Sequence, residues 1–464
     1  MNSQSTNGRN RISRRRFVRA GAVGALTAAS WQRVAGANER IGIGFIGYGL
    51  IGRSHVEDFK AQRDAALVAM AESHRGRLEE GSAAMGGSVA KYGDFRKMLE
   101  NKDVDAVVIS TPDHWHALQT MLACAAGKDV YVEKPLTLFV REGRWMVEVA
   151  RRHKRVVQVG TQQRSAPHYQ RARQFIRQGG LGKIAMVRDD FHRNILPGFG
   201  NPPDQDPPPE LDWDMFVGPA PMRPYNPNRG IYQFRWFWDY SGGQITNWGQ
   251  HSLDIVHWYL DAKGPIAVYS TGGRRFLQDN CEVPDVQDTI MEYPGWTVIQ
   301  SVLECSDSRE VTPLTFYGTN GSLEISRAGF TVTPDAEIPA INLMPGVRTG
   351  HPTGGPKAVP EEGRRKMRTQ RIRDTSGRES EMLRRHARNF LDCVRSRQEP
   401  ISDLESGHRV ATALHLANLS LRLGRRIHWD ADKEEILGDP EAGAMLVRPY
   451  RKPWDAELRS LNVS

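Results

Sequence analysis

The chain has 464 residues, of which 39% are hydrophobic and 25% are charged, a composition typical of a folded globular protein rather than a disordered one. The length suits two or three domains, and no run of 18 apolar residues predicts a membrane-spanning helix. The net charge of +9 is concentrated in residues 1–37, which hold seven arginines and no acid. The remainder has 56 basic and 54 acidic residues, so nucleic-acid binding is not expected.

Residues 1–37 follow the order of an export signal. The basic segment Ser13-Arg14-Arg15-Arg16-Phe17-Val18-Arg19 precedes a mildly apolar stretch at 20–29 and the small residues Ala35-Gly36-Ala37. This order resembles a twin-arginine signal peptide, and it implies the twin-arginine export machinery as partner, a periplasmic or extracytoplasmic location and cleavage near Ala37. A disordered basic tail is the alternative. No cysteine stands where a lipoprotein anchor would, so no membrane anchor is expected.

Between residues 38 and 160 the pattern alternates between buried strands and helices. Apolar runs predict strands at 41–46, 66–71, 105–110, 129–133 and 156–159, with helices after the first strand to residue 61 and at 95–100, 116–126 and 140–153. This alternation predicts an α/β domain with a doubly wound parallel sheet, the Rossmann arrangement.

The pattern changes after residue 161, and residues 161–430 are expected to form an α+β domain with a large, mostly antiparallel open sheet that leaves one face wet. Residues 196–228 are rich in proline and predict a surface excursion without strand or helix. Residues 337–380 predict a mobile insertion, and residues 431–464 a C-terminal tail. Expected elements are helices at 168–177, 386–395 and 407–423 and strands at 184–189, 267–270, 288–293, 297–304, 315–318 and 322–325.

The first predicted strand ends in the glycine turn Gly47-x-Gly49-x-x-Gly52, which opens a helix. The first glycine allows a tight turn, the second a close approach to a pyrophosphate, and the third close packing of helix on strand. Backbone N–H groups at the helix start, at Leu50 and Ile51, can bind phosphate oxygens. The turn therefore predicts a dinucleotide site, and a merely structural glycine turn is the alternative.

An acid follows the turn at the expected distance. Glu72 ends the second strand, 20 residues after Gly52, where it would accept hydrogen bonds from the adenine ribose hydroxyls. Its charge would repel a 2′-phosphate, so NAD is favoured over NADP. Arg75 lies close enough in sequence to weaken that preference.

Two further segments stand at predicted strand ends: Ser110-Thr111-Pro112-Asp113-His114-Trp115-His116 and Glu133-Lys134-Pro135. With the glycine turn they resemble the Gfo/Idh/MocA family (glucose-fructose oxidoreductase, inositol dehydrogenase and rhizopine catabolism) over residues 40–330, and the closing segments resemble an exported subgroup of it. The resemblance implies that Thr111, Pro112, His114, His116 and Glu133 lie beside the cofactor. The two histidines could suggest a metal pair, but no carboxylate stands at a fixed spacing from them, so no metal is predicted.

In that family the lysine of the Glu-Lys-Pro turn projects between nicotinamide and substrate, which here is Lys134. A lysine in this place contacts the cofactor and stabilises the alkoxide charge that develops on the substrate. The resemblance also implies a cis peptide before Pro135. A solvated lysine at a strand end is the alternative.

The second catalytic segment of the family matches residues 242–254. His251 is the expected general base, because the pKa of imidazole lies near working pH, and Asn247 stands one helical turn before it, where the two side chains would meet. Relatives commonly have an aspartate in place of Asn247, and an amide can orient a neighbour but cannot share charge. His251 as a buried structural histidine stays open, as does Asp254 as substrate ligand or surface acid.

The aromatic segment Arg235-Trp236-Phe237-Trp238-Asp239-Tyr240 precedes this region. Indole rings stack on the apolar faces of sugars, so Arg235 and Trp236 are candidate carbohydrate contacts, with an aromatic core or an oligomer seam as the alternative. Arg164 and His192 stand where polar groups can face the cleft between the domains.

The pattern as a whole predicts an NAD(P)-dependent oxidoreductase acting on a secondary alcohol of a sugar, cyclitol or glycoside. Since no nicotinamide pool is maintained outside the cytoplasm, the cofactor is expected to be tightly bound and recycled in each turnover. An NAD-dependent, redox-assisted glycosidase or lyase is the alternative, and a non-catalytic binding protein the third. The resemblance further implies a homo-oligomer, a dimer or tetramer.

Overall fold

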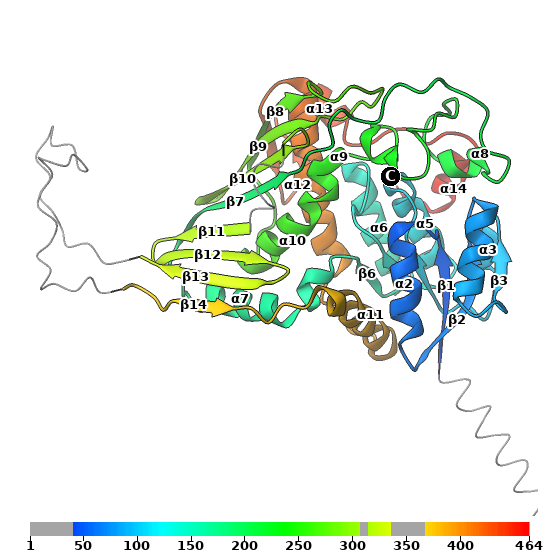
Figure 1. Cartoon of the computed structure of the whole chain (residues 1–464), viewed down its shortest axis with the longest axis horizontal. Helices are drawn as coiled ribbons and strands as arrows, with labels where there is room; N and C mark the ends of the chain where they lie inside the picture. Colours follow the sequence, from blue (N-terminus) through cyan, green and yellow to red (C-terminus); the bar gives the residue numbers. More distant parts are fainter. Residues whose placement is uncertain (1–39, 307–313, 336–366, 464) are drawn as a thin grey trace, which may run out of the picture.

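The computed structural model describes residues 40–306, 314–335 and 367–463, which form two sheets with helices packed around them (Figure 1). The predicted signal peptide at residues 1–37 lies outside the described residues, as does most of the predicted insertion at residues 337–380. Among the described residues, no helix is both long enough and apolar enough to cross a membrane.

The N-terminal sheet has six strands in the order β3-β2-β1-β4-β5-β6, all parallel, which confirms the predicted Rossmann arrangement. The strand order changes direction between β1 and β4, the position where such sheets bind dinucleotides. The elements are β1 (Ile41–Ile46), α2 (Leu50–Lys60), β2 (Ala65–Ala71), α3 (Arg75–Ala84), β3 (Ala90–Tyr92), α4 (Phe95–Leu99), β4 (Ala106–Ile109), α5 (Asp113–Ala125), β5 (Asp129–Val132), α6 (Val140–Arg152) and β6 (Val157–Val159).

The second sheet has ten strands in the order β14-β13-β12-β11-β7-β10-β9-β8-β15-β16, all antiparallel except the β7–β10 pair. Along β9, Met291 is buried and Ile290 is exposed, so one face packs on the core and the other faces solvent, as predicted. The strands are β7 (Ile184–His192), β8 (Ala267–Gly273), β9 (Val286–Tyr293), β10 (Trp296–Leu303), β11 (Leu314–Gly318), β12 (Gly321–Ser326), β13 (Gly329–Pro334), β14 (Ile372–Asp374), β15 (Ile427–Asp430) and β16 (Glu435–Ile436).

Three helices fill the space between the two sheets: α7 (Pro167–Arg177), α10 (Gly249–Leu260) and α12 (Leu404–Leu423) (Figure 1). Helix α12 packs both on α6 of the N-terminal domain and on β8 of the second sheet. Its burial on both sides explains why its sequence is apolar over most of its circumference. The helix therefore fixes the second sheet against the dinucleotide domain.

The end of the predicted insertion is ordered, which corrects the expectation for residues 367–380. Strand β14 pairs with β13 there, and α11 (Glu379–Ser396) begins before the predicted insertion ends. Helix α11 returns to the N-terminal domain, where Phe390 packs edge-on against Phe59 and Tyr131. This buried aromatic contact gives the segment a fixed place.

Residues 431–464 were expected to be a tail, and this expectation is wrong for the described part. They contain β16, α13 (Pro440–Ala444) and α14 (Trp454–Ser460). Trp454 is buried against Trp115 and Phe95 of the N-terminal domain, with ring centroids 4.7 and 6.2 Å away. The chain therefore ends by covering the dinucleotide domain.

The proline-rich residues 196–228 are also more than a surface excursion. They include a short helix, α8 (Trp213–Val217), whose aromatic side chains are buried in a cluster of their own. Residues 209–218, which we call the strap, bind the N-terminal domain through Arg75 N–H to the Glu210 carbonyl and Asp212 N–H to the Ser73 carbonyl, both at 2.9 Å. These contacts with the N-terminal domain hold the strap in place, although its sequence has no helical or strand periodicity.

Candidate active site

The glycine turn between β1 and α2 forms the floor of a crevice. Gly47 has φ +91°, a conformation that few residues with side chains adopt. A Cβ on Gly52 would lie 2.7 Å from the Gly47 carbonyl oxygen, so the third glycine serves helix packing as predicted. Around Gly49, in contrast, a Cβ would meet only Arg77, at 3.9 Å. This space at the N-terminus of α2 fits a phosphate group.

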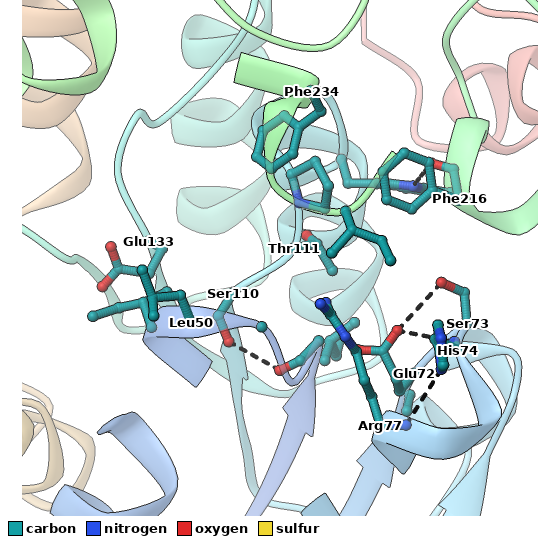
Figure 2. A pocket seen from close by; sticks show the side chains of 18 of the residues that line it. Leu50, Glu72, Ser73, His74, Arg77, Ser110, Thr111, Glu133, Phe216 and Phe234 are labelled. Atoms are coloured by element: carbon teal, nitrogen blue, oxygen red, sulfur yellow. Dashed lines mark hydrogen bonds between the residues drawn. The ribbon is translucent and has the colours of Figure 1, made fainter. Parts of the chain in front are cut away.

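A cavity of about 360 Å³ extends from this turn to the strap (Figure 2). Most residues predicted to bind the cofactor line it, from both sides of the strand-order change at β1 and β4. They are Gly47, Gly49, Leu50, Ile51, Glu72, Thr111, Pro112, Glu133 and Lys134.

Glu72 lies after β2 with its carboxylate held at the edge of the cavity (Figure 2). Oε2 accepts the Tyr48 backbone N–H at 2.7 Å and Oε1 accepts that of His74 at 3.0 Å. A carboxylate fixed in this way can accept ribose hydroxyls and repel a 2′-phosphate, which favours NAD. Arg75, expected to weaken that preference, instead donates to the Pro209 carbonyl of the strap at 2.7 Å.

Several lining residues were not predicted, among them Arg77, Phe216 and Phe234. Arg77 extends from α3 into the cavity on the same side as Glu72, and Phe216 of the strap and Phe234 of η2 (Gln233–Trp236) stand across from the glycine turn (Figure 2). Arg77 could have been found as a cation in the first turns of the helix that follows Glu72. The two phenylalanines come from stretches without periodicity, so only the folded chain places them.

Lys134 follows β5 at the lip of the cavity, and the peptide before Pro135 is cis, as the resemblance implies. Its Nζ donates to Oδ1 of Asn247 at 3.0 Å and to the Asn247 carbonyl at 3.1 Å. Burial, chiefly, and the charge of Arg235 lower the pKa of Lys134 to about 8, although the carboxylate of Glu133 opposes them. This lysine therefore changes charge near neutral pH.

Glu133 holds the turn that carries Lys134. His55 Nε2 lies 2.7 Å from Oε1 of Glu133, and Oε2 accepts the Lys134 backbone N–H at 3.2 Å. Burial acts to raise the pKa of Glu133, but the hydrogen bond and charge of His55 and the charge of Lys134 lower it overall. Glu133 is therefore a carboxylate that fixes the backbone of its neighbour.

Asn247 and His251 lie on two helices, because α9 (Gly243–Asn247) and α10 are interrupted at Trp248. Asn247 makes its side-chain hydrogen bonds to Lys134 and to Gln244, whose Oε1 accepts from Asn247 Nδ2 at 3.0 Å. The predicted contact of Asn247 with His251 on one helix face is corrected accordingly. The bond to Gln244 turns the amide oxygen of Asn247 towards Lys134.

His251 is buried, and its ring stands edge-on to Trp248 with centroids 6.0 Å apart. Within the described residues, its Nδ1 has no hydrogen-bond partner. Burial and the charges of Lys134 and Arg327 hold the pKa of His251 well below 6.5. The imidazole is therefore neutral at neutral pH, but its pKa does not lie near working pH as expected from the sequence, and His251 is not among the residues that line the cavity. Arg327, on the turn after β12, was not predicted as part of the site.

His114 and His116 lie behind the cavity wall, which corrects their prediction as cofactor contacts. His114 Nε2 is 3.1 Å from the Phe216 carbonyl of the strap, and the two ring nitrogens of His116 lie 2.8 and 2.6 Å from the carbonyls of Thr111 and Pro135. Both histidines thus hold backbone segments in place. In the described parts of the chain, no group of three or more His, Cys, Asp or Glu residues could hold a metal ion.

Arg164 and Asp254, predicted as substrate contacts, bind one another. Arg164 Nε and Nη2 each donate to an Asp254 oxygen at 2.7 Å, with both side chains almost fully buried, and Nη1 donates to the Ile401 carbonyl at 3.1 Å. The prediction is corrected: each charge is neutralised by the other, so the pair is structural.

Of the remaining substrate candidates, only Arg235 lines the cavity. Trp236 is buried in the cluster beneath the strap, where Nε1 donates to Glu304 at 2.7 Å, so the aromatic-core alternative holds for it. His192 ends β7 with Nε2 3.3 Å from Ser301 Oγ, outside the cavity lining. The aromatic segment therefore contributes one polar lining residue rather than a stacking platform.

The fold and the crevice define a class: a two-domain oxidoreductase fold with a dinucleotide-binding N-terminal domain. Two family profiles match the chain, "Oxidoreductase family, NAD-binding Rossmann fold" over residues 41–161 and "Oxidoreductase family, C-terminal alpha/beta domain" over residues 194–272 and 378–456. Together they cover more than half of the sequence. The chain belongs to the Gfo/Idh/MocA oxidoreductase family, and its N-terminal domain is the NAD-binding domain of that family.

Curated relatives match chiefly through this domain. The chain is 31% identical over 147 residues to the myo-inositol 2-dehydrogenase of Thermotoga maritima, which is 32% of this chain and 43% of that protein. It is 33% identical over 144 residues to an inositol 2-dehydrogenase of Rhizobium meliloti, or 31% and 43% of the two chains. The chain thus matches less than half the length of these relatives.

Solved structures match over more of the chain. A levoglucosan dehydrogenase in complex with NADH and levoglucosan has a TM-score of 0.62 at 18% identity, covering 84% of this chain and 99% of the other. An NAD-binding oxidoreductase from Klebsiella pneumoniae has a TM-score of 0.61 at 18% identity, with the same coverage. At this identity the likeness establishes a shared fold.

Proposed function

We propose that the protein is an NAD-dependent oxidoreductase that oxidises a secondary alcohol of a sugar, cyclitol or glycoside. The observation that carries the proposal is the position of Lys134, which lines the dinucleotide cavity and whose Nζ reaches Asn247 in the second domain at 3.0 Å. A substrate hydroxyl that binds Nζ beside this contact would lie between the cofactor domain and the second domain. The names of the relatives, inositol and levoglucosan dehydrogenases, agree with a polyhydroxy substrate.

The reaction divides between these residues. When bound, NAD would accept the hydride from the carbinol carbon. Protonated Lys134 donates a hydrogen bond to the substrate oxygen and stabilises its negative charge as the carbonyl forms. Neutral His251, with its unpartnered Nδ1, receives the hydroxyl proton. Asn247 orients Lys134 through its amide oxygen and leaves the charge of the lysine unneutralised.

The strap supports the proposal that the cofactor stays bound and is recycled in each turnover. Phe216 covers the cavity, and its carbonyl accepts Trp115 Nε1 at 3.0 Å. Arg451 from the C-terminal segment donates to Asp214 at 2.8 Å and to the Gly218 carbonyl at 3.0 Å. For the cofactor to leave, these contacts would have to open, which slows its exchange.

A covered cofactor suits a second reaction equally well, because a redox-assisted glycosidase or lyase returns the hydride to the same substrate. Oxidation of a ring hydroxyl would acidify the neighbouring C–H, and elimination would release the aglycone and leave an enone. In a glycosidase, water would add to the double bond before the hydride returns to the carbonyl; in a lyase, the hydride would return without addition of water. A non-catalytic binding protein is the third candidate, and the lowered pKa of Lys134 argues against it.

The test is a panel of sugars, cyclitols and aryl glycosides given to the purified protein, with cofactor absorbance and products followed together. A ketosugar or lactone formed with reduction of the bound cofactor supports the oxidoreductase. Aglycone released without net NADH supports the glycosidase instead. Activity on an identified substrate that survives both Lys134→Ala and His251→Ala would overturn the assignment of the site.

We also propose that the chain is exported by the twin-arginine route and cleaved near Ala37, on the residues of its leader alone. Export of folded proteins suits an enzyme that carries its cofactor with it. Fractionation of expressing cells tests this proposal. The mature chain is expected in the periplasm. Replacing Arg14 and Arg15 by lysine is expected to leave uncleaved precursor in the cytoplasm, and unchanged export of this variant would contradict the proposal.

A homo-oligomer, dimer or tetramer, is proposed through the solvent-facing side of the ten-stranded sheet. Tyr269 of β8, Ile290 of β9 and Tyr317 of β11 leave large apolar side chains exposed there, and Tyr269 and Ile290 are cross-strand partners. Light scattering after gel filtration should give at least a dimer, and Ile290→Arg should weaken it. A monomeric wild-type protein would contradict the proposal.

A further inference from the structure

A cation outside the cofactor cavity faces the catalytic residues. Arg327 lies in the turn between β12 and β13, and its guanidinium carbon is 5.6 Å from the centroid of the Trp248 ring. Trp248 in turn stands 6.0 Å from His251. Arg327 and His251 thus both contact the Trp248 ring.

This arginine is incompletely bonded. Its Nη1 forms an ion pair with Glu379, but in the described portion of the chain no acceptor lies within reach of its buried Nε. His251 Nδ1 nearby is also buried without a partner. Buried polar atoms are nearly always paired, so two such atoms at one site indicate groups that a ligand completes.

Three cations lie around this position. The charges of Arg235 and Arg327 both act to lower the pKa of Lys134, against those of Glu133 and Asp113. The buried acids of this region have partners: Glu133 is bonded to His55, and Asp113 accepts from Ser241 at 2.5 Å. Asp189 accepts from Ser252, the residue after His251, at 2.5 Å and from Gln300 at 2.7 Å. Glu379, the ion-pair partner of Arg327, has a side chain that is 65% exposed, so solvent screens this pair.

We propose that the substrate is an acidic sugar, a uronic acid or a glycoside of one, and that Arg327 binds its carboxylate. The Glu379 pair occupies Nη1, which leaves the edge formed by Nε and Nη2 for two parallel hydrogen bonds to a planar carboxylate. The inference rests on the proposed function, because it places the reacting hydroxyl between Lys134 and His251 and the acid beside Trp248.

A purely structural role for Arg327 makes a different prediction. Glu379 opens helix α11, so the ion pair could serve only to anchor that helix to the β12–β13 turn. In that case Glu379→Gln and Arg327→Gln would have the same effect. If Arg327 binds substrate, Glu379→Gln leaves binding intact or strengthens it, because it removes a competing carboxylate.

The experiment is calorimetric titration of the protein with its cofactor bound, using matched pairs: D-glucuronate against D-glucose, D-galacturonate against D-galactose, with D-glucose 6-phosphate as a second anion. We expect at least one uronate to bind about tenfold or more tightly than its neutral partner. Arg327→Gln abolishes this preference, and Arg327→Lys restores part of it. Glu379→Gln keeps it, as does Arg373→Gln, an exposed arginine on neighbouring strand β14.

Several results would overturn the inference: no uronate binding, equal binding within the pairs, a preference that survives Arg327→Gln or is lost in Glu379→Gln, or tighter binding of the sugar phosphate. Cofactor absorbance distinguishes failure of the carboxylate site at Arg327 from failure of the proposed oxidoreductase function. Reduction of bound NAD by neutral polyols, with no preference for acids, would support the oxidoreductase function and contradict the carboxylate site at Arg327. Uronate binding that depends on Arg327 but never reduces NAD would support the acid site and contradict the proposed oxidoreductase function.

Discussion

The Nζ atom of Lys134 lies 3.0 Å from Oδ1 of Asn247, and this hydrogen bond crosses from the dinucleotide domain to the second domain. Lys134 follows β5, whereas Asn247 ends α9. The amide accepts the bond without adding a negative charge, so burial keeps the pKa of Lys134 at about 8. Asn247 thus binds the lysine ammonium without neutralising its charge.

The first prediction concerns pH. Lys134 is protonated below its pKa, and only the protonated form stabilises the alkoxide, so kcat for oxidation should fall as pH rises through about 8. Asn247→Asp places a carboxylate against Nζ and should move this alkaline limb upwards by about one unit or more. A pH profile of kcat measures both effects. An unmoved limb in the variant would mean that Lys134 does not control it.

Removal of the lysine side chain should separate chemistry from cofactor binding. Lys134→Ala is expected to lower kcat by roughly 10²–10³, the usual loss for one donor to a developing oxyanion. Bound NAD should remain, because the glycine turn and Glu72 are unchanged. Lys91→Ala, at an exposed ion pair with Glu79, is the matched control. If cofactor loss alone accounts for the lower rate, Lys134 is a cofactor residue only.

Glu72 should determine cofactor affinity and type. Glu72→Ala removes a charged acceptor for the ribose hydroxyls, which is worth about 1.5–3 kcal/mol, so NAD affinity should fall about 10- to 100-fold while NADP is rejected less strongly. Glu79→Ala, an exposed acid on α3, is the control. Titration of cofactor-free protein with NAD and with NADP measures both affinities. An equal loss of NAD affinity in Glu72→Ala and Glu79→Ala would argue against a role of Glu72 in ribose binding.

The strap should govern how long the cofactor stays. Phe216→Ala opens the cover of the cavity and should raise the NADH dissociation rate by about tenfold or more, in keeping with the 2–5 kcal/mol that loss of a buried large side chain costs. Stopped-flow displacement measures this rate. Phe276→Ala, at an exposed phenylalanine, should leave it unchanged. Equal rates in wild type and Phe216→Ala would show that the strap does not retain the cofactor.

Arg164 and Asp254 should matter for stability. Asp254→Asn leaves a buried guanidinium without its counter-charge and should lower the free energy of unfolding by about 3–5 kcal/mol, as measured by denaturant titration. The double variant Arg164→Met, Asp254→Leu should recover part of this loss, because it buries no unpaired charge. A change in KM without a change in the free energy of unfolding would instead indicate that Arg164 and Asp254 contact the substrate.

The dinucleotide domain could be predicted closely because local signals agree there. The run at residues 41–46 matches β1 residue for residue, and the turn, Glu72 and Lys134 all reach one cavity. Helix α3 was missed because its ten residues include Gly76 and Gly81 and carry almost no apolar periodicity. Its tertiary contacts, rather than its own pattern, make it helical.

The second domain was harder to predict, because its contacts are between segments far apart in sequence. Arg164 pairs with Asp254 across 90 residues, and Trp236 with Glu304 across 68, and no local pattern predicts which polar side chains find each other. The helix break at Trp248 likewise redirects Asn247 from His251 to Lys134. The residues of the candidate site could be proposed from the sequence, but their hydrogen-bond partners followed only from the fold.

The proposed function requires a dinucleotide that stays bound to the protein between turnovers. The most direct measurement is mass spectrometry of the small molecules released when exhaustively gel-filtered, purified protein is denatured. A stoichiometric amount of NAD or NADH is expected. Protein that emerges free of dinucleotide, and that binds added NAD only in rapid exchange, would contradict it.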